Sequence, residues 1–391
     1  MALRFLTAGE SHGPALTVVL EGLPAGVLVD LDRVHAEMRR RMGGYGRGGR
    51  MAIETDRVEI VGGVRFSRTL GSPVSLVIRN LDHSNWTDAM PVHGPHPGPG
   101  PARSVSRPRP GHADLAGALK YDTHDARDVF ERSSARETAA RTAAGAIAKS
   151  MLREAGIEVT SHTLGVGRAR APALADDAFD ALLALADDAP MRTIDPAAAA
   201  AMIEAVELAR RRKDSIGGVF EVLARGVPPG LGTHAHWDRR LDARLGGALL
   251  SIQAVKGVSV GEGVESAARH GSEQHDEIGY DAAHGRFVRP TNRAGGIEGG
   301  MSNGEMIRLR GYLKPLATLP RPLRTVDLVT KQPLDAVRER TDTIPIVAAG
   351  VVGEGMTALV LADELLIKFG GDSVGELLRN LESYREQLRR F

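Results

Sequence analysis

The segment Gly9-Glu10-Ser11-His12-Gly13 places a carboxylate, a hydroxyl and an imidazole between two glycines, just ahead of a β-rich run. Glycines allow the backbone to approach a ligand closely while the polar side chains face it. An imidazole gains and loses a proton near neutral pH, which makes His12 a candidate for acid–base chemistry. A histidine can equally be structural, and the spacing alone leaves that alternative open. We therefore predict a polar pocket here, with His12 as its candidate proton donor.

Five arginines lie in one short glycine-rich segment and are candidates for binding an anion. They are Arg39, Arg40, Arg41, Arg47 and Arg50. The dipole of a preceding helix explains basic residues at its C-terminal end, but it does not reach the last two. A charge-assisted hydrogen bond contributes about 1.5–3 kcal/mol, so a few arginines could dominate the binding of a small phosphate. The segment is not a dinucleotide-binding loop, because it follows a predicted helix instead of joining a strand to a helix.

Four histidines, His93, His96, His112 and His124, raise the question of a metal site. They lack the helical spacing that places two ligands on one face. The chain contains no cysteine, which removes thiolate ligands and disulfides. We predict no metal centre.

The whole chain has the composition of a globular protein, since 42% of its 391 residues are hydrophobic and 25% are charged. Its net charge of +1 gives no global attraction to nucleic acid or to an anionic membrane. The N-terminal segment reaches Glu10 before the apolar core of an export signal develops. The apolar stretch from Thr343 meets Glu354 before it reaches the length of a membrane span. We expect a cytoplasmic protein with no membrane role.

A β-rich run, a turn rich in glycine and proline, and a helix follow one another twice in the sequence. The first set is a β-rich run at residues 16–20 and a helix that Asp30 or Asp32 would cap. The second set is a β-rich run at residues 219–223 and a helix at residues 238–253. This repetition suggests an internal duplication.

A third helix has the clearest start signal in the chain. Ser134 and Glu137 have the spacing of a capping box, and small and apolar residues continue through Met151 to a stop at Gly156. The exposed N–H groups of its first turn could bind an anion, although a well-capped structural helix has the same spacing. Residues 171–212 predict further helices, and residues 373–391 predict a terminal amphipathic helix.

Residues 91–110 are too rich in proline and glycine for regular structure and predict a loop. A solvated linker and a lid over a site are both open. The segment Arg-Pro-Gly-His-Ala-Asp that begins at Arg109 directly follows this loop and favours the lid.

Seven segments, taken in order, resemble the chorismate synthase family. Their order and spacing span nearly the whole chain, and no single one would be sufficient. The segments are GESHG (9–13), YGRGGRM (45–51), RPGHAD (109–114), RSSARETAAR (132–141), SIQAVKGV (251–258), NRAGGIEGGMSNGE (292–305) and RTD (340–342).

The resemblance implies an enzyme of the shikimate pathway, which supplies the aromatic amino acids. This lyase (EC 4.2.3.5) forms chorismate from 5-enolpyruvylshikimate 3-phosphate by 1,4-elimination of phosphate. The resemblance also implies bound reduced FMN with no net redox change. The departing ring proton is not next to a carbonyl, so a cofactor that lends and recovers an electron relieves a difficulty that a side-chain base alone would face. A single α+β domain over residues 1–391 follows, with layered sheets and long helices around an internally repeated core, assembled as a homotetramer.

Three residues of this sequence match acid–base positions of the family. His12 matches the histidine near the substrate phosphate and would protonate the leaving group. His112 matches the histidine thought to protonate the reduced flavin. Asp342 matches an aspartate near the flavin N5 that takes part in proton removal.

Binding residues follow from the same resemblance. Arg41 and Arg47 match positions assigned to NADPH, but they suit the phosphate and carboxylates of the substrate better, and Arg50 and Arg136 join them. The flavin contacts implied by the family are Arg132, Ser133, Ser134, Gln253, Ala254, Gly299, Lys314, Pro315, Leu316, Ala317, Thr318 and Arg340.

The sequence departs from the family pattern at Thr341, where His or Ser is often found, and in the insertion at residues 91–101. Two other functions stay open at this level: an Arg-rich protein that binds nucleic acid, and a flavin reductase that reuses the scaffold. No separate nicotinamide motif shows whether NADPH reduces the flavin here or a separate flavin reductase supplies it.

Overall fold

Two antiparallel sheets form the outer layers of the fold. The computed structural model describes residues 3–49, 53–94 and 103–391. The first sheet has the order β1-β2-β6-β3 and the second has the order β10-β15-β9-β7-β8. Their strands are β1 (Arg4–Ala8), β2 (Ala15–Glu21), β3 (Val58–Gly62), β6 (Val74–Arg79), β7 (Glu158–Val166), β8 (Ala169–Arg170), β9 (Gly218–Arg225), β10 (Val255–Val260) and β15 (Ile307–Leu313).

The helices and the remaining short strands fill the space between and around these sheets. The helices are α1 (Leu31–Met42), α2 (Asp114–Tyr121), α3 (Arg127–Ser133), α4 (Thr138–Glu154), α5 (Phe179–Leu183), α6 (Pro196–Arg211), α7 (Leu241–Leu250), α8 (Gly271–Gln274), α9 (Ile346–Phe369) and α10 (Val374–Arg390). Short hairpins pair β4 (Val64–Arg65) with β5 (Arg68–Thr69), β11 (Gly279–Asp281) with β12 (Arg286–Val288), β13 (Ile297–Glu298) with β14 (Met301–Ser302), and β16 (Arg324–Val326) with β17 (Pro333–Asp335).

The chain builds the same unit twice. In the first half, β1 and β2 are followed by α1, then β3 and β6, then α4. In the second half, β7 and β9 are followed by α7, then β10 and β15, then α9. In both sheets the second and fourth of these strands lie side by side in the middle, and the first and third flank them. The repetition seen in the sequence is therefore a repetition of topology.

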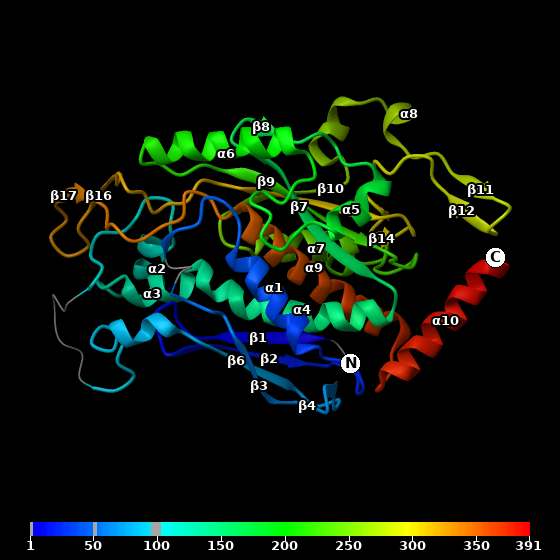
Figure 1. Ribbon diagram of the computed structural model, residues 1–391, viewed down its shortest axis with the longest axis horizontal. Coiled ribbons are helices and arrows are strands. Elements are labelled where there is room, and N and C mark those ends of the chain that lie inside the picture. The colour runs from blue at the N-terminus through cyan, green and yellow to red at the C-terminus, as the bar shows by residue number, and fades with distance from the viewer. Residues whose placement is uncertain (1–2, 50–52, 95–102) are drawn as a thin grey trace.

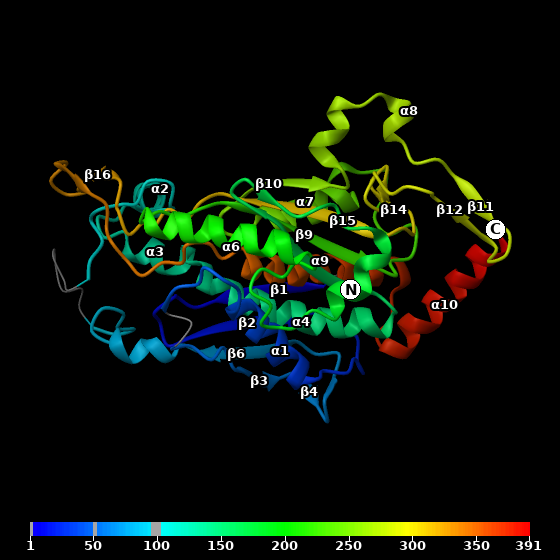
Figure 2. The same ribbon diagram turned by 45° about the horizontal axis from the view of Figure 1, so that its top comes forward.

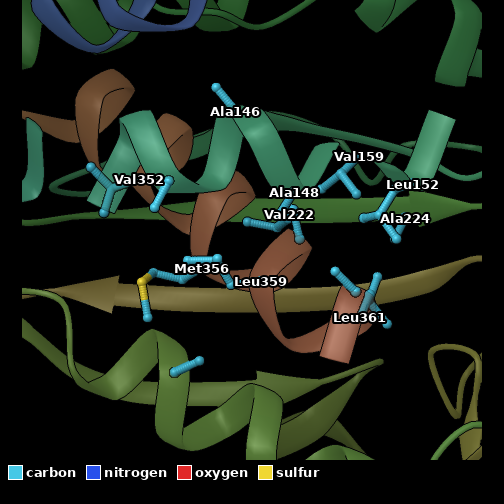
Figure 3. Packing of buried hydrophobic residues seen from close by; sticks show 14 of the residues in the cluster. Ala146, Ala148, Leu152, Val159, Val222, Ala224, Val352, Met356, Leu359 and Leu361 are labelled. Carbon is cyan, nitrogen blue, oxygen red and sulfur yellow. The ribbon is translucent and has the colours of Figure 1, made fainter. Parts of the chain in front are cut away.

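Helices α1, α4 and α9 lie between the two sheets (Figures 1 and 2). Helix α4 packs against the first sheet through β2 and β6, whereas α9 packs against the second through β7 and β9. Apolar residues from α4, α9 and the strands of the second sheet meet in one continuous core, part of which Figure 3 shows. Helices α4 and α9 cross closely because Gly145 lies directly against Gly355.

Helix α9 is long and apolar enough, by length and composition alone, to cross a membrane. However, 94% of its most apolar window is buried inside the protein. It does not stop at Glu354, because that charge is paired within the core. We conclude that α9 is the central helix of this fold.

Several predicted helices have the expected ends. Asp30 caps α1 by accepting hydrogen bonds from the N–H groups of Asp32 and Arg33. Helix α4 ends just before Gly156, and Ser373 caps α10. The alanine-rich residues 171–212 form α5 and α6 with irregular chain between them.

The predicted capping box at Ser134 is wrong in one half. Ser134 accepts a hydrogen bond from the N–H of Arg136, as expected, but this caps a short 3-10 turn, and α4 begins only at Thr138. The carboxylate of Glu137 does not turn back to the backbone. It accepts hydrogen bonds from Arg141 one turn later in α4, from Thr7 of β1 and from Gln253 after α7 instead.

The described part of the predicted loop, residues 91–94 and 103–110, has neither helix nor strand. Residues 95–102 lie outside the part of the chain that the structure describes. The segment after them is bonded to the rest of the fold, since the hydroxyl of Ser106 donates to Asp327 at 2.6 Å. The side chain of Arg109 likewise donates to Thr318 at 2.7 Å.

Candidate active site

A cavity of about 530 Å³ lies beside the N-terminal ends of α4 and α9 and the C-terminal end of α1. Both halves of the repeat contribute to its wall, which is completed by the loops before α2, after α7 and after β15. Among the described residues, six cationic side chains and two acidic ones line it, so its lining is rich in positive charge although the chain as a whole is nearly neutral. These cations are Arg41, Arg47, Arg109, Arg136, Lys314 and Arg340, and the acids are Glu339 and Asp342.

His12 lies in the wall of this cavity and is held from three sides. Its ring Nδ1 is 2.8 Å from a carboxylate oxygen of Glu131, and its backbone N–H donates to the same oxygen at 2.9 Å. Its Nε2 lies 3.9 Å from Asp82, and the ring stacks on Trp86 with 3.8 Å between centroids. Hydrogen bonding through Nδ1 leaves Nε2 as the nitrogen that can exchange a proton with a ligand.

Glu131 is a buried carboxylate that stays charged. Burial alone would raise the pKa of Glu131, but the hydrogen bond and charge of His12 and the neighbouring Arg127 hold it below its usual value. The Arg127 guanidinium donates to Glu131 at 3.0 Å. A fixed negative charge therefore stands behind His12.

His112 has the same kind of support from a different segment. Its Nδ1 lies 2.5 Å from Asp114, which is fully buried at the start of α2. Burial opposes ionisation of Asp114, but His112 and Arg109 hold its pKa well below the usual value. Arg109 lies over the ring of Phe130, 3.8 Å from its centroid, and fixes the loop that carries His112.

Arg41 and Arg136 share one buried carboxylate. Arg41 donates to Asp56 at 2.8 Å and to the hydroxyl of Thr138 at 3.1 Å. Arg136 also contacts Asp56 and donates to Asn80 at 3.0 Å. Burial lowers the pKa of Arg41 to about 10, and the like charge of Arg136 adds to this effect. Arg136 also lies 3.4 Å from the buried carboxylate of Glu54. Two guanidinium groups held in fixed positions at the cavity wall are well suited to receive an anion.

Asp342 and Arg340 have separate partners on the opposite wall. Asp342 accepts a hydrogen bond from the backbone N–H of Gly48 at 2.6 Å and lies 3.4 Å from the Nε of Arg47. Arg340 donates to Asp82 at 2.5 Å. The RTD segment therefore ties the arginine-rich loop and the vicinity of His12 to one side of the cavity.

The structure brings most of the predicted site residues together and leaves three of the described ones outside. The predicted residues in the cavity wall are His12, Arg41, Arg47, His112, Ser133, Ser134, Arg136, Gln253, Ala254, Lys314, Leu316, Ala317, Thr318, Arg340 and Asp342. Arg132 does not line the cavity, because its guanidinium donates to the backbone oxygens of Thr7 and Gly9. Gly299 lies in the turn between β13 and β14, and Pro315 is also not in the wall. Arg50 lies outside the described residues.

Sequence reasoning missed the carboxylates that support the site. Glu131 directly precedes the segment that starts at Arg132, and Asp114 is the last residue of the segment that contains His112. Their positions beside or within these family segments could have identified both carboxylates. Asp56 and Asp82 carry no such signal, because only folding brings them to the cavity. Among the described residues, no three His, Asp or Glu side chains form a group that could hold a metal ion.

Comparisons with known proteins agree over the length of the chain. A family model described as chorismate synthase matches residues 3–366. A chorismate synthase of Solibacter usitatus is 54% identical and covers 100% of both chains. One of Symbiobacterium thermophilum is 53% identical over 99% of this chain and 100% of its own. A crystal structure titled as chorismate synthase superposes with a TM-score of 0.79 at 38% identity, covering 100% of this chain and 99% of that one.

Proposed function

The chain belongs to the chorismate synthase family, and on that premise we propose how its own residues carry out the reaction. The activity is that of a lyase of the shikimate pathway, which forms chorismate from 5-enolpyruvylshikimate 3-phosphate and requires reduced flavin. The substrate carries one phosphate and two carboxylates. The observation that carries the proposal is that two histidines, each backed by a buried carboxylate, stand in the wall of one cationic cavity.

His12 is the proton donor to the departing phosphate. In its protonated form it keeps one proton on Nδ1 toward Glu131, so the transferable proton sits on Nε2. The neighbouring cations stabilise the negative charge that grows on the phosphate as the C–O bond breaks. Arg41 and Arg136 are positioned for this role, because Asp56 holds both rigidly before substrate arrives. Arg47 serves the substrate in the same way, and Arg50 is assigned there by the family resemblance.

The cavity has the features that a flavin requires. Apolar side chains, among them Ile252, Leu316 and Val352, offer a dry surface for a planar ring. The side-chain oxygen of Gln253 is buried and has no hydrogen-bond partner among the described residues, so a polar ring N–H would satisfy it. We assign the ring to this wall and the flavin to FMN, with Gln253, Ala254 and residues 314–318 as its contacts. When bound, the reduced flavin supplies an electron to the substrate and recovers it.

His112 and Asp342 act at the other end of the reaction. Asp114 holds Nδ1 of His112, so that its Nε2 can give or take a proton at the flavin. Asp342 is fixed by Gly48 and Arg47 and is the candidate acceptor in the removal of the ring proton. The carboxylate stays in place because the backbone N–H of Gly48, and not a mobile side chain, is its closest partner.

The assembly is proposed to be a cytoplasmic homotetramer of single-domain chains. The family resemblance supports this, and so does an apolar strip on the outer face of the first sheet. There Leu6 and Val19 are cross-strand neighbours with 77% and 41% of their surface exposed. Analytical ultracentrifugation tests the tetramer, and a single species at the monomer mass would contradict it.

NADPH as the source of electrons is tested by its oxidation in the presence of FMN without added reductase.

The activity is tested by adding chemically reduced FMN and substrate to the protein without oxygen. Chorismate and phosphate should appear in equal amounts, with oxidised FMN as the control that gives none. The variants His12→Ala and His112→Ala should bind FMN and lose turnover by about 10²- to 10⁴-fold. Folded protein that forms no chorismate would refute the proposed function, and wild-type rates in either variant would remove that histidine from the mechanism.

A further inference from the structure

A second cavity, of about 430 Å³, lies between α1, the C-terminal end of α4, the start of β7 and the loop that follows α5. It shares no lining residue with the candidate active site, which lies at the opposite end of α4. Five of its lining residues are cationic and three are acidic. They are Arg33, Arg40, Lys149, Arg153 and Arg192, and Glu37, Glu158 and Asp187.

Two of the cations are fully matched by carboxylates. Arg40 donates to Glu37 at 2.6 Å and to Glu354, behind the wall, at 2.6 Å. Lys149 donates to Glu37 at 2.9 Å and also contacts Glu354. These four groups form a closed network of two positive and two negative charges, so they leave no charge for a ligand.

Arg192 is a buried cation that no carboxylate matches within the described chain. Its Nε donates to the backbone oxygen of Ser161 at 3.0 Å, and one Nη donates to the hydroxyl of Thr160 at 3.1 Å. Its other Nη has no hydrogen-bond partner among the described residues, although the residue is only 6% exposed. Burial lowers the pKa of Arg192, and the more distant charges of Glu354 and Glu37 offset this effect only in part.

Arg153 is the second cation without a close carboxylate. Its side chain makes no hydrogen bond within the described chain, and its only ion pair there is a long one, with Glu37 at 3.8 Å. Burial lowers the pKa of Arg153 as well. The other acids of the wall do not supply the missing charge. Glu158 pairs with Arg225 at 2.6 Å, and Asp187, whose side chain is 56% exposed, lies 3.9 Å from Arg40.

We propose that this cavity is a binding site for a small oxyanion, held through a phosphate or carboxylate group by Arg192 and Arg153. A guanidinium offers two parallel N–H donors, which is the geometry that the oxygens of either group accept. A buried positive charge without a partner is unfavourable, and an anion in the cavity removes that penalty. The site is separate from the catalytic one and does not depend on the proposed function.

The test is calorimetric titration of the whole protein with inorganic phosphate and, in a second arm, with malonate. One equivalent per chain of 5-enolpyruvylshikimate 3-phosphate, which does not turn over without reduced flavin, is added first, so that the catalytic cavity is occupied and no excess is left to fill the second cavity. The variants are Arg192→Gln and Arg153→Gln. The control is Arg211→Gln, which removes an equal charge from the exposed end of α6.

We expect one anion to bind per chain, with affinity at least about ten-fold weaker in both cavity variants and unchanged in the control. Preference for phosphate or for malonate identifies which group the site takes. If Arg192→Gln does not fold, Arg153→Gln decides, because that side chain has no hydrogen bond to lose. Equal binding by wild type and Arg153→Gln, or no saturable binding of either anion, overturns the proposal.

Discussion

Replacing Glu131 by glutamine tests whether the carboxylate behind His12 positions the proton donor. Glutamine has nearly the same shape but carries no charge and has only one acceptor oxygen. In the native site one oxygen of Glu131 receives both the backbone N–H and the ring Nδ1 of His12, and the other receives the Arg127 guanidinium. The amide N–H₂ of Glu131→Gln must therefore face a donor on one side, either His12 or Arg127.

The size of the effect follows from these contacts. A hydrogen bond to a charged acceptor contributes about 1.5–3 kcal/mol and one to a neutral acceptor about 0.5–1.5 kcal/mol, so each of the affected bonds weakens by roughly 1 kcal/mol. We expect the variant to lose about 1–3 kcal/mol of stability. Since an acid–base group contributes about 10²–10⁴ in rate and His12 is displaced but not removed, kcat should fall about 10- to 100-fold. Glu131 does not line the cavity, so the substrate KM should change less than about threefold.

A double-mutant cycle under reduced flavin separates positioning from general damage. Glu131→Gln is compared in the wild-type protein and in the His12→Ala variant, with kcat and KM measured in both. If Glu131 acts through His12, the substitution has almost no further effect once the imidazole is gone. An equal loss of kcat in both backgrounds, or wild-type kcat in the single variant, refutes the assignment.

Three other outcomes follow from single contacts. Asp114→Asn should lower kcat about 10- to 100-fold through His112 without loss of flavin binding, and unchanged turnover under reduced flavin would contradict this. The pKa of Glu221 is lowered from 4.5 to about 2 by His162 and nearby arginines despite its burial. A depressed pKa contributes stability that is present above about pH 4.5 and is lost as the pH falls toward 2. We therefore expect Glu221→Gln to be less stable than the wild type by up to about 3 kcal/mol at neutral pH. Unfolding measured at a series of pH values should show this difference shrinking between pH 4.5 and 2. In Gly145→Ala the added methyl group would overlap the backbone of α9, which should lower the free energy of unfolding by about 1–3 kcal/mol. The control is Gly246→Ala, where an added Cβ meets nothing, and chemical unfolding should show it more stable by about 0.5–1 kcal/mol. Equal effects at the two glycines would refute the close crossing of α4 and α9.

The sequence predicted those parts of the fold that depend on short stretches of chain. The cap at Asp30 and the stop at Gly156 are decided by a few neighbouring residues, and both are found. The repetition of strand, turn and helix was visible because each unit must place the same apolar face against the central helix layer. The capping box predicted at Ser134 was wrong because of a contact with a distant strand. The carboxylate of Glu137, which would have closed the box, accepts a hydrogen bond from Thr7 of β1.

The candidate site shows the same limit. The histidines and most of the arginines could be named from the sequence, because the resemblance to the family places them in recognisable segments. The carboxylates that pair with these side chains could not be named from the sequence. Asp56 and Asp82 come beside the cavity wall only when the loops before β3 and after β6 pack against it. Proximity in space, and not in sequence, decides which carboxylate supports which cation.

The arginines at the end of α1 show most directly why spacing alone misjudged the site. Their position at a helix C-terminus gave all three the same explanation, the helix dipole. Successive residues of a helix point about 100° apart, however, and the three side chains have different surroundings. Arg39 is exposed, Arg40 is buried against Glu354 in the charge network beside the second cavity, and Arg41 is buried against Asp56 in the wall of the first. The two cavities thus lie on different sides of the C-terminal end of α1, and consecutive arginines of this helix line them, Arg40 the second and Arg41 the first.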